Sequence, residues 1–154
     1  MIQRKQTLFL LGVFIAVLLC LFFPVASTEP VAMGDAAYIF NLGVKCDNAI
    51  VSFASTPLFV LLSLSGAISL VTIFLYKKRK LQIKLCLWAV AFLLLWYGYY
   101  ALLVCKVIVL PISSAAIRIS FTACLPLVAI ILLFMARSGI KHDEKLVRAA
   151  DRIR

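Results

Sequence analysis

The residues that could carry chemistry are few and scattered. The chain has one histidine, His142, beside Asp143, and five cysteines with no CxxC pair among them. A quinone-linked thiol oxidase would need such a pair, and a zinc site needs cysteine and histidine ligands at short spacing. No phosphate-binding glycine loop and no GxSxG motif is present in the sequence. The sequence therefore predicts no catalytic set, no metal and no cofactor.

The best candidates for a ligand site are two tyrosines and an arginine, Tyr97, Tyr100 and Arg118. A flat hydrophobic ligand such as a quinone could stack on the tyrosines in an outer vestibule, beside the arginine. The same residue types also suit anchoring, because tyrosine is enriched at membrane interfaces and arginine reaches toward headgroups. We expect the anchoring role, with the vestibule as the alternative.

The elements that must position these residues are unusually apolar. Of 154 residues, 65% are hydrophobic and only 14% are charged, whereas soluble proteins have about 45–50% and about 25%. A chain this short cannot bury so much apolar surface in water. The composition therefore excludes a soluble enzyme and a disordered chain.

Four apolar stretches are about long enough to cross the hydrocarbon core, which needs roughly 20 residues. The expected spans are about 7–23, 57–76, 81–105 and 112–136, and the last of them could begin as late as Ile119. Backbone groups in lipid must bond within their own segment, so these spans should be helices. The sequence predicts one integral domain over residues 1–154, an all-α membrane protein built as a four-helix bundle.

No aspartate or glutamate lies in any of the four stretches. Proton relays and ion pathways normally need such groups inside the membrane, so a proton-coupled transporter is disfavoured. The first stretch has a second interpretation, because Arg4 and Lys5 before an apolar run and small residues near Ala26 resemble a signal peptide. We expect the helix to be retained, and its cleavage would leave three spans in the same orientation.

Positive charge gathers on one side of this arrangement. Of the 16 lysines and arginines, 13 fall in the N-terminus, in the link between spans two and three, and in the tail 137–154, whereas the six acids divide equally between the two sides. Lysine and arginine are enriched in cytoplasmic segments, so both termini should be cytoplasmic. The net charge of +10 then belongs to a membrane surface with anionic headgroups and not to a nucleic-acid site.

The outer loop 24–56 alternates apolar and polar residues on both sides of the polar turn 45–48. This period-two pattern predicts a small β-hairpin that covers the outer helix ends. The short apolar loop 106–118 should lie at the same interface, as a strand beside the hairpin. Cys46 and Cys105 both fall on this oxidising side and could form a disulfide, with two free thiols as the alternative.

The tail should form a short helix of its own. Gly139 is typical of a helix stop, and four apolar residues recur beyond it on one helical stripe: Leu146, Val147, Ala150 and Ile153. The sequence predicts a short amphipathic C-terminal helix that lies in the headgroups, docks on a partner or is simply solvated.

Three blocks carry a resemblance to a known family: residues 1–4 directly before the first span, the junction 71–86, and the ending 143–154. Over the full length the chain resembles the four-span membrane proteins of Bacteroidetes bacteria called domain of unknown function 4293. The resemblance implies a bacterial inner-membrane protein with cytoplasmic termini, and it implies no activity, cofactor or catalytic residue.

We expect these cytoplasmic blocks to form one basic surface. The favoured function is a non-enzymatic scaffold or accessory subunit whose basic face docks a protein partner or anionic lipid. The candidate docking residues are Lys77, Lys78, Arg79, Lys80, Arg148 and Arg152. The alternatives are that these charges only set the topology, or that the protein is a small carrier or membrane enzyme. Small residues in the second span also permit a homo-oligomer.

Overall fold

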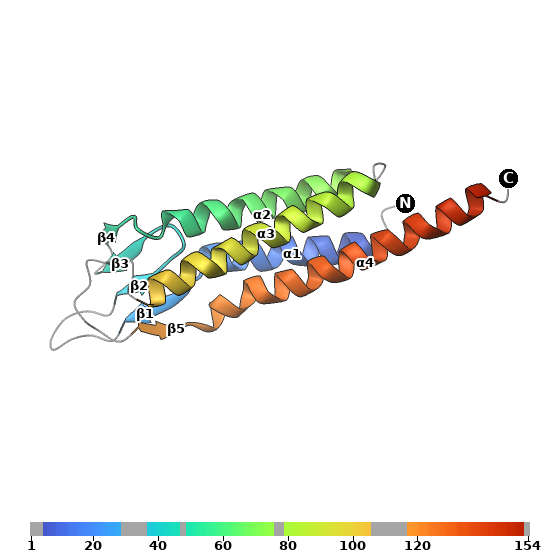
Figure 1. The fold of residues 1–154 in the computed structure, drawn as a ribbon. Coiled ribbons are helices and arrows are strands. Elements are labelled where there is room, and N and C mark those ends of the chain that lie inside the picture. The colour runs from blue at the N-terminus through green and yellow to red at the C-terminus, as the bar shows by residue number, and fades with distance from the viewer. Residues whose placement is uncertain (1–4, 29–36, 47–48, 76–78, 106–116, 153–154) are drawn as a thin grey trace.

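The computed structural model describes residues 5–28, 37–46, 49–75, 79–105 and 117–152, and at 5, 46, 49–51, 79 and 145–152 it describes the backbone alone. Four antiparallel helices form an elongated bundle (Figure 1). They are α1 Lys5–Phe22, α2 Thr56–Phe74, α3 Arg79–Val104 and α4 Leu125–Arg152. α1 packs against α2 and α4, and α3 packs against the same two helices.

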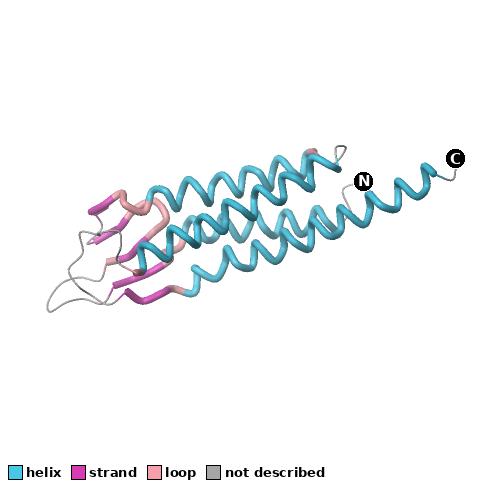
Figure 2. Tube along the Cα trace, viewed as in Figure 1, coloured by secondary structure: helices cyan, strands magenta, loops and turns pink. Residues whose placement is uncertain are grey.

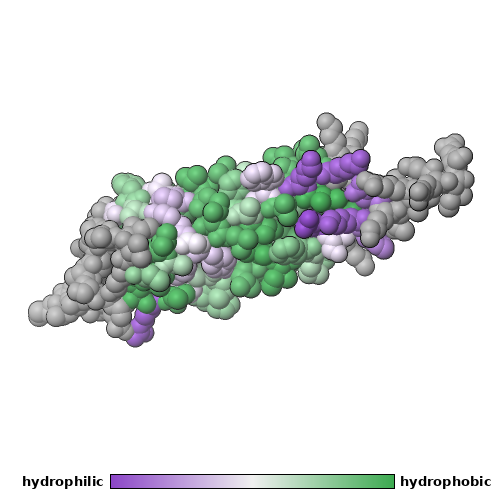
Figure 3. All heavy atoms as spheres, viewed as in Figure 1, coloured by the Kyte–Doolittle hydropathy of each residue, from purple (hydrophilic) through white to green (hydrophobic). Residues whose placement is uncertain are grey.

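Within the described residues, three helices are long and apolar enough to cross a membrane: Thr56–Phe74, Lys80–Val104 and Phe121–Glu144. α1 adds a shorter apolar helix, Gln6–Phe22. The outward-facing side chains are apolar as well, since Trp88 is 60% and Phe74 is 77% exposed. Figure 3 shows hydrophobic side chains covering the middle of the bundle on the face in view. Helices that are apolar on all sides are typical of a membrane protein.

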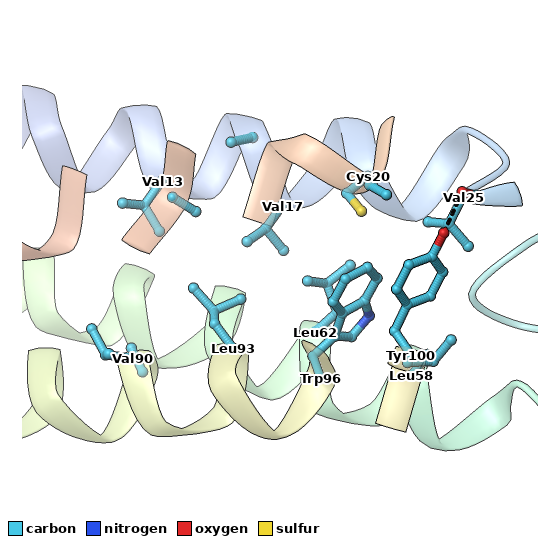
Figure 4. Close-up of a cluster of buried hydrophobic side chains, with 14 of the residues drawn as sticks. Val13, Val17, Cys20, Val25, Leu58, Leu62, Val90, Leu93, Trp96 and Tyr100 are labelled. Carbon is cyan, nitrogen blue, oxygen red and sulfur yellow. Dashed lines mark hydrogen bonds between the residues drawn. The ribbon is translucent and has the colours of Figure 1, made fainter. Parts of the chain in front are cut away.

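The bundle core combines branched apolar side chains with small residues. Figure 4 shows Val13 and Val17 of α1 facing Leu62 of α2 and Leu93 of α3. On α2, the buried residues Ser65, Gly66 and Ser69 form a strip of small side chains. Small residues let helix backbones approach closely in lipid, where no hydrophobic force draws helices together.

A five-stranded antiparallel sheet covers one end of the bundle, here called the sheet end (Figure 2). The strand order is β4-β3-β2-β1-β5. The strands are β1 Ala26–Thr28, β2 Tyr38–Ile39, β3 Val44–Cys46, β4 Ala49–Ser52 and β5 Ile117–Ile119. The expected hairpin is confirmed as β3–β4. A strand also forms at the end of the loop 106–118, but this strand, β5, pairs with β1 at the opposite edge of the sheet and does not lie beside the hairpin.

The sheet is larger than expected because the alternating run 38–44 is not one strand. It breaks into β2 and β3 around a tight turn in which the Phe40 amide donates to the Gly43 carbonyl at 2.9 Å. The turn directs Asn41, which is fully buried, toward the bundle. The fold is therefore mostly helical, with a small sheet in place of a lone hairpin.

Two expectations for the fourth helix are wrong. Residues 117–124 form β5 and a short 3-10 helix, Phe121–Cys124, so the α-helix begins only at Leu125. The tail is helical, but α4 passes through Gly139 to Arg152 without a break. A glycine inside a helix costs only about 1 kcal/mol, and here it admits a neighbour: a Cβ at Gly139 would lie 3.0 Å from the Gln6 Cγ of α1.

Gly66 marks a close approach of α1 and α2 and generates a first prediction. A Cβ at Gly66 would lie 3.0 Å from Val17 Cγ1, whereas one at Gly98 would meet nothing within 4 Å. We expect Gly66→Leu to lower the free energy of unfolding by about 1–3 kcal/mol through overpacking. Gly98→Leu, the matched control, should be neutral or slightly stabilising. Thermal unfolding in detergent micelles compares the two, and equal melting temperatures would contradict the packing described here.

Candidate functional site

The aromatic end of α3 ties the sheet end together. Three tyrosine hydroxyls each donate to a backbone carbonyl in a different segment of the chain. These bonds run from Tyr97 to Ala123 at 2.8 Å, from Tyr99 to Ala54 at 2.8 Å and from Tyr100 to Val25 at 3.1 Å. The last of them is the dashed line in Figure 4. One helix thereby fixes the entrance of α2, the exit of α1 and the start of α4.

Asn41 lies at the centre of this end with its side chain fully used. Its Nδ2 donates to the Cys20 carbonyl at 2.5 Å, and its Oδ1 accepts from Trp96 Nε1 at 3.0 Å. The Cys20 carbonyl lies in the last turn of α1, and its usual partner four residues on is Pro24, which has no amide hydrogen. The asparagine therefore supplies the donor that proline removes.

The expected vestibule residues are built into this packed end. Tyr100 is 7% exposed and stacks on Trp96, with ring centroids 5.1 Å apart and planes 10° from parallel. Tyr97 meets the same tryptophan edge-on at 5.0 Å. Arg118 lies on β5, exposed and opposite Ser27. Both tyrosine hydroxyls are bonded to backbone and their rings are packed, which is the arrangement of an anchor.

The cysteines form no chemical centre in the part of the chain that the structure describes. Cys20 and Cys86 are buried, and Cys105, directly after α3, is exposed. The Cys46 side chain lies outside the described atoms, so its pairing with Cys105 stays a prediction. Among the described residues, no three histidine, cysteine or acidic side chains could hold a metal ion.

The opposite end of the bundle, here called the basic end, is polar and charged. Lys80 and Lys84 of α3 and Lys141 of α4 are exposed there, and Figure 3 shows hydrophilic side chains gathered at this end. Gln82, 7% exposed, donates from Nε2 to the Thr72 carbonyl at 2.9 Å. It caps the end of α2 as Asn41 caps the end of α1.

The candidate docking residues are placed unevenly. Lys77 and Lys78 lie outside the described residues, and Arg79 is the first residue of α3, with its backbone alone described. Arg148 and Arg152 lie on the last turns of α4, again as backbone. Figure 1 shows these turns extending beyond the other three helices.

Contacts with α1 hold the base of this extension. Gln6 Nε2 donates to Asp143 Oδ2 at 2.6 Å, one turn beyond the close approach at Gly139. Sequence reasoning missed Gln6, Gln82 and Asn41, because each acts through a partner distant in the chain. Only Pro24 gave a signal, since a proline after an apolar helix leaves a carbonyl that needs another donor.

The family model described as domain of unknown function (DUF4293) matches residues 2–153. The chain belongs to this family. A comparison with curated proteins found no match. The resemblance inferred from the junction and tail blocks is therefore confirmed for this DUF4293 chain.

Asn41 gives the second prediction for this DUF4293 protein. Asn41→Leu should lower the free energy of unfolding by about 2–5 kcal/mol, since it leaves the Cys20 carbonyl and Trp96 Nε1 buried without partners. A Trp88→Phe background leaves Trp96 as the sole tryptophan, so its fluorescence reports on this site during unfolding. Tyr38→Phe, on the exposed side of the sheet, is the control and should change stability by less than about 0.5 kcal/mol. A stable Asn41→Leu protein with unchanged Trp96 emission would refute the capping role.

Proposed function

We propose that this protein is a four-span protein of the bacterial inner membrane with both termini in the cytoplasm. In this proposal it is a non-enzymatic scaffold or accessory subunit that docks a protein partner through its basic end. The packing of α1 against both α2 and α4 supports a fourth span, because a helix inside the bundle crosses wherever its neighbours cross. Its 18 residues extend for about 27 Å, close to the hydrocarbon thickness of about 30 Å.

The continuity of α4 is the observation that carries the docking proposal. Ile140 is the last residue of α4 described as buried, and the helix continues to Arg152. These twelve further residues extend for about 18 Å at the rise of an α-helix. The extension follows the long direction of the bundle (Figure 1), so in a membrane its last turns point into the cytoplasm and do not lie among the headgroups.

The sequence of the extension suits a helix-in-groove partner. Apolar Leu146, Val147 and Ala150 alternate with basic Lys145 and Arg148, the pattern by which an amphipathic helix docks through an apolar face flanked by charge. Lys80 and Lys84 are exposed at the basic end of the bundle, where they are placed to meet anionic headgroups of the cytoplasmic leaflet. Partner and lipid would then contact different parts of one basic end.

The topology is tested by cysteine accessibility. In a variant that retains only Cys105, a membrane-impermeant maleimide should label the protein in intact spheroplasts, because Cys105 follows α3 at the sheet end. A matched variant whose only cysteine replaces exposed Lys141 should be labelled only after permeabilisation. The reversed pattern, or labelling of both sites from outside, would overturn the proposed orientation.

The docking role is tested by charge reversal on the extension. We expect Arg148→Glu with Arg152→Glu to reduce recovery of a cross-linked cytoplasmic partner by about tenfold, since two attractive contacts become repulsive. Membrane insertion and thermal stability should stay unchanged. Lys45→Glu on β3, at the sheet end, is the control and should leave recovery unaffected. Unaltered abundance together with unaltered partners in the double variant would rule out docking through these arginines.

A further inference from the structure

Arg137 is the first charged residue of α4, and its side chain is partly buried. Its Nε atom is buried and has no hydrogen-bond partner among the residues that the structure describes. Buried polar atoms in proteins nearly always have a partner, and an exception marks a place where a water, an ion or a ligand is expected. The guanidinium of Arg137 is such a place.

Arg137 lies near the basic end of α4, next to Ala136, which is fully buried. α4 packs against both α1 and α3. Lys141 follows Arg137 by one helical turn on the same face of α4 and is exposed. Two cations thus lie one above the other beside a helix interface, where one anionic group can reach both.

The position of Arg137 along α4 matches the boundary of a bilayer. The twelve residues from Leu125 to Ala136 carry no charge and extend for about 18 Å, and the preceding 3-10 turn adds about 8 Å. Together they cover most of the hydrocarbon thickness of about 30 Å. In the proposed membrane arrangement Arg137 therefore lies at the level where the phosphates of the cytoplasmic leaflet begin.

The same face of α4 changes from apolar to cationic along its length. Ile130, Phe134, Arg137 and Lys141 follow one another at helical spacing, and Phe134 is 50% exposed. A phospholipid has this polarity, with acyl chains that would lie against Ile130 and Phe134 and a phosphate that would reach Arg137. A free phosphate ion would make no contact with the apolar side chains of Ile130 and Phe134.

We propose that Arg137 and Lys141 bind the phosphate of an anionic phospholipid at the inner end of α4. The planar guanidinium donates paired hydrogen bonds to phosphate oxygens, and basic sites between helices on the cytoplasmic side are suited to anionic headgroups. Lys141 disfavours a zwitterionic lipid, because its ammonium would repel the ammonium of that headgroup. The site rests on the proposed membrane orientation and is independent of partner docking.

The first test uses the unaltered protein. In detergent, phosphatidylglycerol should bind with saturation and raise the melting temperature, whereas phosphatidylcholine should bind at least about tenfold more weakly. Native mass spectrometry with each lipid measures this directly. Equal binding and equal stabilisation by the two lipids would overturn the proposal. If inorganic phosphate at millimolar concentration displaced phosphatidylglycerol and gave the same stabilisation, the ligand would be a free anion and the lipid assignment would be wrong.

The second test assigns the site. Arg137→Gln should weaken phosphatidylglycerol binding by about tenfold, and Arg137→Lys should recover only part of it because the paired donors are lost. Lys45→Gln, which removes one exposed cation from β3 at the sheet end, is the control and should alter binding less than twofold. Equal losses in Lys45→Gln and Arg137→Gln would mean that diffuse charge binds the lipid and would refute the site. Partner recovery should be the same in Arg137→Gln as in the wild type, so a failure of docking and a failure of this site give different results.

Discussion

The carbonyl groups at the end of a helix need donors, and in lipid no water supplies them. In this chain Pro24 removes the donor that the Cys20 carbonyl would normally have, and a side-chain amide from the sheet, Asn41, takes its place. The same amide accepts from Trp96 of α3. One buried asparagine thus links α1, the sheet and α3, at the same end where three tyrosines bond to backbone carbonyls. A second amide, Gln82, satisfies the end of α2 in the same way.

The two ends of the bundle differ in the polar groups that they expose, and each has one buried side-chain atom without a partner among the described residues, Ser55 Oγ at the sheet end and Arg137 Nε at the basic end. At the sheet end, the three tyrosine hydroxyls donate to backbone carbonyls, and Asn41 bonds to the Cys20 carbonyl and to Trp96. The rings of Trp96 and Tyr100 stack closely. At the basic end, lysines are exposed and the Nε of Arg137 is buried without a protein partner among the described residues. Of these two atoms, only the Nε of Arg137 belongs to a charged group beside exposed lysines. In the proposed orientation, the basic end is therefore the surface for interactions and the sheet end covers the bundle.

Much of the architecture could be predicted from the sequence, because the length of an apolar run and the alternation of a hairpin are local properties. The helices and the β3–β4 pair follow from them. The pairing of Ala26 with Ile119 could not be predicted, since it joins three-residue strands more than ninety positions apart in the chain. The prediction that a helix stops at Gly139 was wrong for a related reason: the glycine makes room for Gln6 of α1, which approaches it only in the folded bundle. The candidate docking arginines could be chosen by charge alone, whereas Arg137 could be singled out only from its burial.

The uninterrupted α4 also connects the two ends of the bundle. It follows β5 after Ser120 and a four-residue 3-10 turn. β5 pairs with β1, which follows α1 by only a few residues. Because α4 has no break, the segment that projects from the basic end near Arg152 is joined along one helix to the β1–β5 pair at the sheet end. A partner that shifted the projecting turns along the helix axis would therefore act on the β1–β5 pairing as well.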